Sequence, residues 1–461
     1  MVLINNIENI DMNSLYDLRT FLLQEEYVTS FNQLLDSGYG IIHTPRRSFY
    51  HSTGYGEHLV SFFGNNTGLL KDLAHSIFPE DLLSKLIEIG FIIEGKKKFI
   101  SHYRVIPVNQ QYLVLIPFRP AADPPVYIGA DSLTFRRLLQ VNNRPKRVLD
   151  LATGSGYQLF ALPWQTSESA MLGIDINPNA VEIANLNAKW NHSPWISFQE
   201  GDITSNVDTQ VDGKFDLIIG NPPIIPTPSD LETKLQKTLH ADGGEDGFRV
   251  LNAFLTSLPQ ILTLNGTAQF ILSLLGNEDT PFLLEYIEEL VISLGFKGSL
   301  IGVKKIPIEI DSYYRGEEEY SNWMSFYKKN KAQFWYRCIL RVEFHHNSPK
   351  FSFHEFYRMD FTMKPTKGMI RSENIIPKAY YYLQNILPIT ATLDNFETSI
   401  STIKKLVRSS KAVDLSVVEF GKFLATKMPT IFNTEGSAIR FWALCINEYW
   451  FQPKYLERVL W

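Results

Sequence analysis

The chain contains 461 residues, of which 44% are hydrophobic and 13% aromatic, and its formal net charge is −5. This length exceeds one average domain and indicates two or three domains, with enough apolar residues for packed cores. The net negative charge argues against a dedicated nucleic-acid-binding protein, although residues 347–461 carry more basic than acidic side chains.

Cysteine usage and the absence of targeting signals indicate a cytoplasmic setting. The two cysteines, Cys338 and Cys445, lie in apolar neighbourhoods, and we interpret them as buried thiols in a reducing cytosol. The first eleven residues lack the basic start of a signal peptide. No stretch approaches the roughly 20 apolar residues of a membrane span. We therefore expect a soluble cytoplasmic protein without membrane contact, and the sequence leaves its oligomeric state open.

Residues 1–126 are predicted to form an accessory domain of small helices and a few strands. Helix-like apolar spacing occurs at residues 27–35, 67–77 and 79–88, and strand-like patterns occur at residues 90–93 and 112–117. Small helices followed by a hairpin predict a helical or winged-helix-like domain, which we expect to contribute to substrate recognition. The Asp123-Pro124-Pro125 segment then favours an extended linker.

Residues 127–346 show a regular alternation of strands and helices. Strand patterns occur at residues 147–151, 170–176, 196–199, 215–220 and 267–274, and amphipathic helical patterns at residues 180–190 and 248–262. This alternation predicts an α/β fold with a doubly wound sheet and helices on both faces. Ligands of such sheets bind at the carboxyl ends of the strands, so residues directly after strands are the best candidates for a site.

The remainder of the chain is predicted to close the sheet and add a further region. A helix at residues 281–294 and a strand at 297–306 precede an aromatic insert at 311–330 and a long strand at 333–344. The two strands match an antiparallel pair interrupted by a helical insert. Residues 347–461 are expected to form a separate C-terminal α+β accessory region, with helices at 399–407 and 415–426.

A glycine-rich turn follows the first strand of the central region, in the order Asp150-Leu151-Ala152-Thr153-Gly154-Ser155-Gly156. Glycines let a ligand approach the backbone closely, and the following helix presents free N–H groups. A dinucleotide fingerprint requires a third glycine where this chain has Leu159. The carboxylate of Asp150 also disfavours a diphosphate. It favours S-adenosylmethionine (SAM), which carries a cationic amino group and a sulfonium.

Two further acidic residues follow the next two strands in the same order. Asp175 ends the second strand, where a carboxylate can accept hydrogen bonds from both hydroxyls of a ribose. Taken alone, an Asp before Asn177-Pro178 also fits a helix cap. Asp202 follows the third strand, where it can hold an adenine amino group. The order of these elements therefore predicts an adenosine-containing cofactor.

The segment Asn221-Pro222-Pro223-Ile224 follows the fourth strand and is the most specific motif. Consecutive prolines fix φ and remove two N–H donors, so the turn presents rigid carbonyl groups. Asn221 adds an amide oxygen acceptor. These acceptors suit a substrate NH₂ or NH group and can aim its lone pair at a methyl group. Catalysis would then consist mainly of proximity and alignment, without a strong general base.

These residues resemble a family of Rossmann-like SAM-dependent methyltransferases with an Asn-Pro-Pro-aromatic motif. The resemblance covers about residues 127–346 and is greatest to the HemK-like glutamine N-methyltransferases. It implies a seven-stranded methyltransferase sheet and SAM as the cofactor, with S-adenosylhomocysteine as the product. Residues 127–132 resemble the segment that covers the methionine end of SAM, and residues 240–247 resemble the loop after the Asn-Pro-Pro motif.

The resemblance assigns roles to the residues of the predicted site. The expected cofactor contacts are Tyr127, Asp131, Asp150, Thr153, Gly154, Gly156, Asp175, Ile176, Asp202, Ile203 and Asn221. Asn221 and Pro222 are the expected catalytic residues. The expected substrate contacts are Pro223, Ile224 and His240. No metal is expected.

The chain departs from the family at Ile224, where the family has Tyr or Phe to stack on a flat acceptor. Stacking on an aromatic ring contributes roughly 1–3 kcal/mol per base, so its loss disfavours a nucleobase. An amide or amino nitrogen of a peptide, protein or small metabolite is the favoured acceptor. The aromatic insert around Tyr313, Tyr314 and Trp323 could supply a ring instead, although a packing role is the stronger interpretation.

Other functions stay open at this point. They include an O- or N-methyltransferase of natural-product biosynthesis, a methyltransferase of tRNA, rRNA or DNA bases, and a SAM-binding scaffold without activity. His240, paired with Asp242, could act as a general base near the cleft, but a polar loop without a catalytic role is the stronger interpretation. The lysines at 96–98 are interpreted as a solvated turn.

Overall fold

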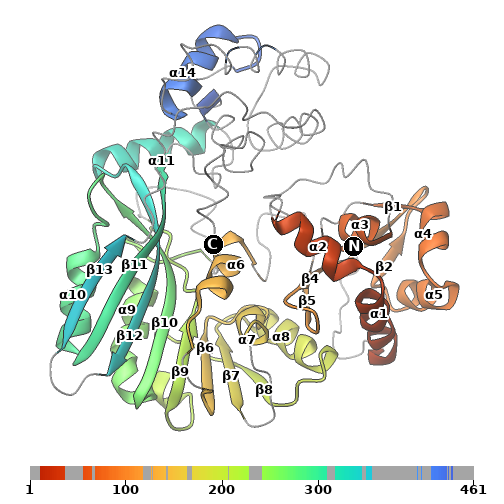
Figure 1. Ribbon diagram of the computed structural model, residues 1–461, viewed down its shortest axis with the longest axis horizontal. Coiled ribbons are helices and arrows are strands. Elements are labelled where there is room, and N and C mark those ends of the chain that lie inside the picture. The colour runs from red at the N-terminus through yellow and green to blue at the C-terminus, as the bar shows by residue number, and fades with distance from the viewer. Residues whose placement is uncertain are drawn as a thin grey trace.

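The computed structural model describes residues 11–36, 55–64, 68–117, 126, 128–141, 144–162, 169–205, 207–227, 241–308, 317–344, 349–355, 402, 406, 417–432, 435 and 438–439. Within these residues the largest unit is an eight-stranded sheet with the order β13-β11-β12-β10-β9-β6-β7-β8 (Figure 1). Its strands are β6 (Arg147–Leu151), β7 (Ala170–Asp175), β8 (Ile196–Glu200), β9 (Phe215–Gly220), β10 (Leu262–Gly276), β11 (Phe296–Pro307), β12 (Phe334–Phe344) and β13 (Lys350–Glu355).

The sheet confirms the predicted α/β fold and adds one strand to it. Strands β8, β7, β6, β9 and β10 are parallel, and β12 and β11 follow as an antiparallel pair. Seven strands were expected, but β13 extends the sheet by pairing in parallel with β11. The sheet therefore reaches into residues 347–461, beyond the expected end of the methyltransferase domain at residue 346.

Helices cover both faces of the sheet, as the alternation of the sequence predicts. Helices α6 (Ala130–Leu138), α7 (Tyr157–Phe160) and α8 (Pro178–Trp190) share an apolar cluster with Val148 and Leu217. Helices α9 (Arg249–Ile261) and α10 (Leu284–Ser293) share a second cluster with Leu149 and Ile218. Successive side chains of a strand point to opposite faces, so a strand buried on both sides appears as a continuous apolar run.

The N-terminal region contains small helices followed by strands, as the sequence predicts, although the two predicted strands lie in different sheets. Its first helices are α1 (Met12–Gln24), α2 (Tyr27–Asp36) and α3 (Tyr55–Leu59), followed by a π-helix at Val60–Gly64. Strand β1 (Leu69–Leu70) leads into α4 (Lys71–Ile77) and α5 (Glu80–Glu88), and then into β2 (Ile92–Glu94) and β3 (Lys98–Ser101). These strands form a sheet of order β1-β3-β2, and β4 (Tyr103–Pro107) pairs with β5 (Leu113–Pro117) as a separate hairpin.

The N-terminal region packs directly onto the methyltransferase sheet through α8. One apolar cluster contains residues of α1, of the β4–β5 hairpin and of α8. The indole N–H of Trp190 in α8 donates to the carbonyl of Leu15 in α1 at 2.6 Å. Figure 1 shows α7 and α8 between the sheet and the N-terminal helices. The division at residue 126 stays a prediction, and it separates two parts that share one core.

The C-terminal part of the described chain contains two more helices. The aromatic insert forms α11 (Glu317–Lys329). Helix α14 (Val417–Lys427) begins two residues after the start of the predicted helix at 415–426 and ends one residue beyond it. Cys338 is buried, as expected, whereas Cys445 lies outside the described residues. Among the described residues, no helix is long and apolar enough to cross a membrane, and no group of three metal-ligating side chains occurs.

Candidate active site

The sheet topology places the predicted motifs at one edge of the sheet. Strands β9, β6, β7 and β8 are consecutive neighbours, and all four are parallel. Leu151 pairs with Gly220 on one side and with Ile174 on the other, so β6, β7 and β9 end at the same level. The glycine turn, Asp175, Asp202 and Asn221 therefore lie at neighbouring strand ends, where doubly wound sheets bind ligands.

The glycine turn adopts backbone conformations that L side chains rarely take. Ala152, Gly154 and Gly156 have φ values of 58°, 57° and 79°. A Cβ atom on Gly156 would also lie 2.5 Å from the ring of Phe198. The turn is tied to its neighbour because the N–H of Thr153 donates to the carbonyl of Ile174 at 3.0 Å. Glycine at 156 is thus required both for its φ and for packing.

Asp150 lies beneath this turn as a buried carboxylate. It is 1% exposed, and its Oδ2 accepts a hydrogen bond from Thr153 Oγ1 at 2.7 Å. Its Oδ1 is buried and has no hydrogen-bond partner among the described residues. Burial, with the nearby Asp175 charge, raises the pKa of Asp150 to about 7. A buried acceptor of this kind would be satisfied by a cationic N–H group, as the amino group of SAM would provide.

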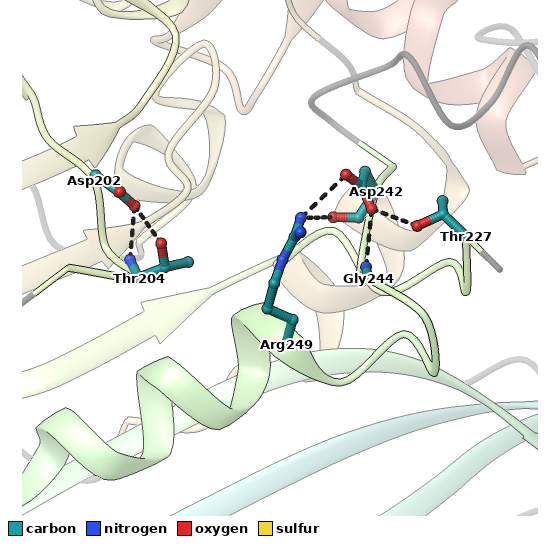
Figure 2. A network of polar contacts seen from close by, with 6 residues as sticks. All are labelled: Asp202, Thr204, Thr227, Asp242, Gly244 and Arg249. Atoms are coloured by element: carbon teal, nitrogen blue, oxygen red, sulfur yellow. Dashed lines mark hydrogen bonds and ion pairs between the residues drawn. The ribbon is translucent and has the colours of Figure 1, made fainter. Parts of the chain in front are cut away.

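Asp175 and Asp202 are both held by local hydrogen bonds. Asp175 accepts from the N–H groups of Gly154 at 2.8 Å and Asn177 at 2.9 Å, and burial raises the pKa of its carboxyl group. Asp202 accepts from the Thr204 hydroxyl at 2.6 Å and N–H at 2.9 Å (Figure 2). Hydrogen bonds from Thr204 and Ser205 lower the pKa of Asp202, so this carboxylate is ionised and stabilises its own turn.

Asn221 is oriented by the first turn of α6. Its amide nitrogen donates to Asp131 Oδ2 at 2.9 Å and to the Ser132 hydroxyl at 3.4 Å. The Ser132 hydroxyl also accepts from the N–H of Gly129 at 3.4 Å, which places it at the start of the helix. Both contacts use the NH₂ side of the amide. In the described part of the chain no donor occupies Asn221 Oδ1, which is therefore available to a substrate N–H.

The Asn-Pro-Pro turn rests on the loop that follows the undescribed residues 228–240. The N–H of Ile225 donates to the carbonyl of Ala241, and the N–H of Gly243 donates back to the carbonyl of Ile225. A Cβ atom on Gly247 would lie 2.5 Å from the carbonyl oxygen of Ile224, and its φ is +81°. This loop thus needs glycine because its backbone lies directly against the turn.

A polar network closes the base of the same loop (Figure 2). Asp242 accepts from the Thr227 hydroxyl at 2.6 Å and the Gly244 N–H at 2.9 Å, and it pairs with Arg249 at 3.0 Å. Burial opposes ionisation of Asp242, but these contacts together hold its pKa below the usual value. Asp242 is thus engaged in holding the loop, which agrees with the interpretation as a polar loop rather than a base.

The aromatic insert packs beside the turn instead of exposing rings. Trp323 and Tyr327 of α11 are each 1% exposed and form a cluster with Trp335, against which Ile225 packs. Ile224 itself packs against the apolar cluster of α9. The described rings of the insert therefore have a packing role next to the turn, through their contact with Ile225. Tyr313 and Tyr314 lie outside the described residues.

Comparisons with known proteins agree with this geometry. Residues 142–260 match a family model described as a methyltransferase domain. A "Putative protein N5-glutamine methyltransferase" of Methanocaldococcus jannaschii is 37% identical over 188 residues, which cover 40% of this chain and 88% of that protein. The chain belongs to the HemK-like family of SAM-dependent methyltransferases.

Release factor glutamine methyltransferases are further relatives within the HemK-like family. The Bacillus anthracis protein is 28% identical over 234 residues, which cover 48% of this chain and 79% of that protein. The Geobacter sulfurreducens protein is 32% identical over 125 residues, and this match spans less than half of that protein, 42%. The matches with these three relatives each cover less than half of this chain, 48% at most.

The structure describes some of the other predicted contacts of this HemK-like site, and these differ in their exposure. Ile176 is 46% exposed directly after β7, whereas Ile203 is 7% exposed and packs in the cluster of α9. Tyr127 and His240 lie outside the described residues. Sequence reasoning missed Ser132 as a partner of Asn221. Its position three residues after Gly129, at the start of a helix, was a signal that it could cap that helix.

Proposed function

We propose that this chain transfers a methyl group from SAM to the side-chain amide nitrogen of a glutamine in a protein. The observation that carries the proposal is the orientation of Asn221, whose NH₂ group is held by Asp131 while Oδ1 is left for an acceptor N–H. The relatives named as protein glutamine methyltransferases support the same acceptor class.

The buried carboxylates fit the cofactor that the family implies. Asp150 Oδ1 and Asp131 Oδ1 are buried acceptors without a partner among the described residues, as a cationic amino group requires. Asp175 would bind the ribose hydroxyls, and the outer lone pairs of Asp202 would reach the adenine amino group. When bound, SAM supplies an electrophilic methyl group on sulfur.

The residues of the chain would act mainly by orientation. Asn221 Oδ1 and the carbonyl of Pro222 would accept the two N–H bonds of the acceptor amide and hold its nitrogen toward the methyl group. If these acceptors hold the N–H bonds out of the amide plane, the nitrogen lone pair is less delocalised and more available to the methyl group. Alignment of reacting groups contributes several kcal/mol to catalysis, so no general base is needed before transfer. As the N–CH₃ bond forms, the S–CH₃ bond breaks and leaves S-adenosylhomocysteine, and the methylated nitrogen then loses one proton to water.

The acceptor can be identified by labelling. We expect extract proteins incubated with the full chain and deuterated-methyl SAM to gain a methyl group on a glutamine side chain, located by tandem mass spectrometry. Label on a nucleobase, with binding to RNA that weakens in salt, would instead support the nucleic-acid alternative. Label on a metabolite oxygen would support the biosynthetic alternative, and label on neither protein nor metabolite nor nucleic acid would contradict a methyltransferase role.

The Asp131–Asn221 contact gives a second test. Asp131→Ala should lower the turnover number by about 10²-fold, because misplacing a reacting group by about 1 Å has an effect of that size. Asp131→Asn keeps an oxygen that can accept from Asn221, so it should recover part of the activity. The measurement is single-turnover methylation of the identified acceptor at saturating SAM. Equal loss in both variants would show that Asp131 acts through its charge and not by orienting Asn221.

A further inference from the structure

Helix α8 and the residue that caps its C-terminus present two buried asparagines, Asn187 and Asn191, to the edge of strand β5. Asn187 Oδ1 accepts from the N–H of Leu115 at 2.8 Å, and its Nδ2 donates to the carbonyl of the same residue at 3.2 Å. Asn191 repeats the pattern with Leu113, at 3.1 Å for the accepted bond and 2.7 Å for the donated one. Each side chain thus pairs with the strand as a neighbouring strand would.

The spacing of the two residues explains why a helix can pair with a strand here. Four residues of an α-helix rise about 6 Å, and two residues of a strand rise about 6.7 Å. Asn187 and Asn191 therefore match Leu113 and Leu115, which point the same backbone groups toward α8. Since β5 lies in the N-terminal hairpin, these four bonds attach that hairpin to the methyltransferase sheet.

The two asparagines differ in their remaining N–H group. Asn187 donates to the carbonyl of Ser155 at 3.0 Å, inside the glycine turn, and is completely buried. Asn191 donates instead to the carbonyl of Asn187 at 2.8 Å, within its own helix. Among the described residues, Asn187 therefore links the N-terminal hairpin to the turn that is expected to hold the cofactor, and Asn191 does not.

We infer that Asn187 is a positioning residue for the cofactor site and makes the N-terminal hairpin part of it. A buried carbonyl needs a hydrogen-bond partner, and Ser155 lies between Gly154 and Gly156, both at positive φ. Two glycines allow the peptide planes between them to rotate at low cost, so a fixed partner is needed to hold one orientation. Asn187 supplies that partner, and its own orientation is set by Leu115.

The inference rests on SAM binding at the glycine turn but not on the identity of the acceptor. Its test is SAM affinity measured by calorimetry on the full chain, with Asn187→Ala compared with Asn191→Ala. Both variants lose the same pair of bonds to β5, so both should lower the melting temperature. Asn187→Ala should also weaken SAM binding by at least about fivefold, the lower end of usual coupling between sites, whereas Asn191→Ala should stay within twofold.

Equal weakening of SAM binding in both variants, or unchanged SAM affinity in Asn187→Ala, would overturn the inference. Either result would show that Asn187 only attaches the N-terminal hairpin to α8. Absence of SAM binding in the unmodified chain would instead contradict the proposed function.

Hydrogen exchange on the unmodified chain tests the same link where Asn187→Ala does not fold. Coupling is reciprocal, so bound SAM should slow exchange of the Leu115 amide more than that of the Leu113 amide. The same change at both amides, or at neither, would also overturn the inference.

Discussion

Replacing Asn221 with alanine should lower the turnover number by about 10²–10³-fold, the effect of removing one preorganised polar group from an active site. The substitution removes the amide oxygen that we assign to the acceptor N–H. It also leaves Asp131 without its 2.9 Å donor, so the start of α6 loses a contact to the Asn-Pro-Pro turn. The measurement is single-turnover methylation of the identified acceptor with SAM in excess.

The controls for Asn221→Ala separate chemistry from folding and cofactor binding. SAM affinity, measured by calorimetry, should change much less than turnover, because the buried carboxylates at the glycine turn are unchanged. Asn252→Ala on α9 removes a similar side chain away from the turn and should leave turnover within twofold. Turnover of Asn221→Ala within about threefold of the unmodified chain would contradict the assigned role and favour a SAM-binding scaffold.

SAM affinity should fall about tenfold between pH 8 and pH 6 because of Asp150. Burial raises the pKa of this carboxyl group to about 7 in the ligand-free chain, so it is ionised at pH 8 and protonated at pH 6. A cationic ligand binds the ionised form, and below pH 7 the proton must first be released at a cost in binding free energy. Affinity therefore rises with pH as Asp150 ionises, until the amino group of SAM itself begins to lose its proton near pH 8.

Asp150→Asn is the matched control for this pH dependence. Asparagine has nearly the same shape and can still accept the hydrogen bond from Thr153, but it does not titrate. The variant should bind SAM weakly at every pH, at or below the affinity of the unmodified chain at pH 6. Calorimetry in two buffers of different ionisation enthalpy would also reveal the released proton. A flat profile in the unmodified chain, or a slope that persists in Asp150→Asn, would assign the titration to another group.

Much of the central fold could be predicted because its signals are local. Strands β6 (Arg147–Leu151) and β9 (Phe215–Gly220) have the bounds expected from their apolar runs. The other parallel strands and helices α8 to α10 differ from expectation mainly at their ends. Residues buried on both faces of a parallel sheet form continuous apolar runs, and turns of glycine and proline mark where the runs stop.

Short or edge elements were harder to predict. Helix α1 (Met12–Gln24) and strands β3 (Lys98–Ser101) and β4 (Tyr103–Pro107) were not expected, and neither was the pairing of β13 with β11. An edge strand is half exposed and has a weak pattern of its own. Whether such a segment pairs depends on which strand edge is free in the folded domain.

The Asn-Pro-Pro motif illustrates both limits. The sequence by itself determined that Asn221 follows a buried strand, that two prolines make its turn rigid, and that Asp150 and Asp175 lie near the ends of successive strands. Only the tertiary structure decided that Asp131, 90 positions earlier in the chain, holds the Asn221 amide. Likewise, only folding brought Asn187 between Leu115 and Ser155. Periodicity and turn chemistry are encoded by adjacent residues, whereas a side-chain hydrogen bond across the fold depends on how separate elements pack.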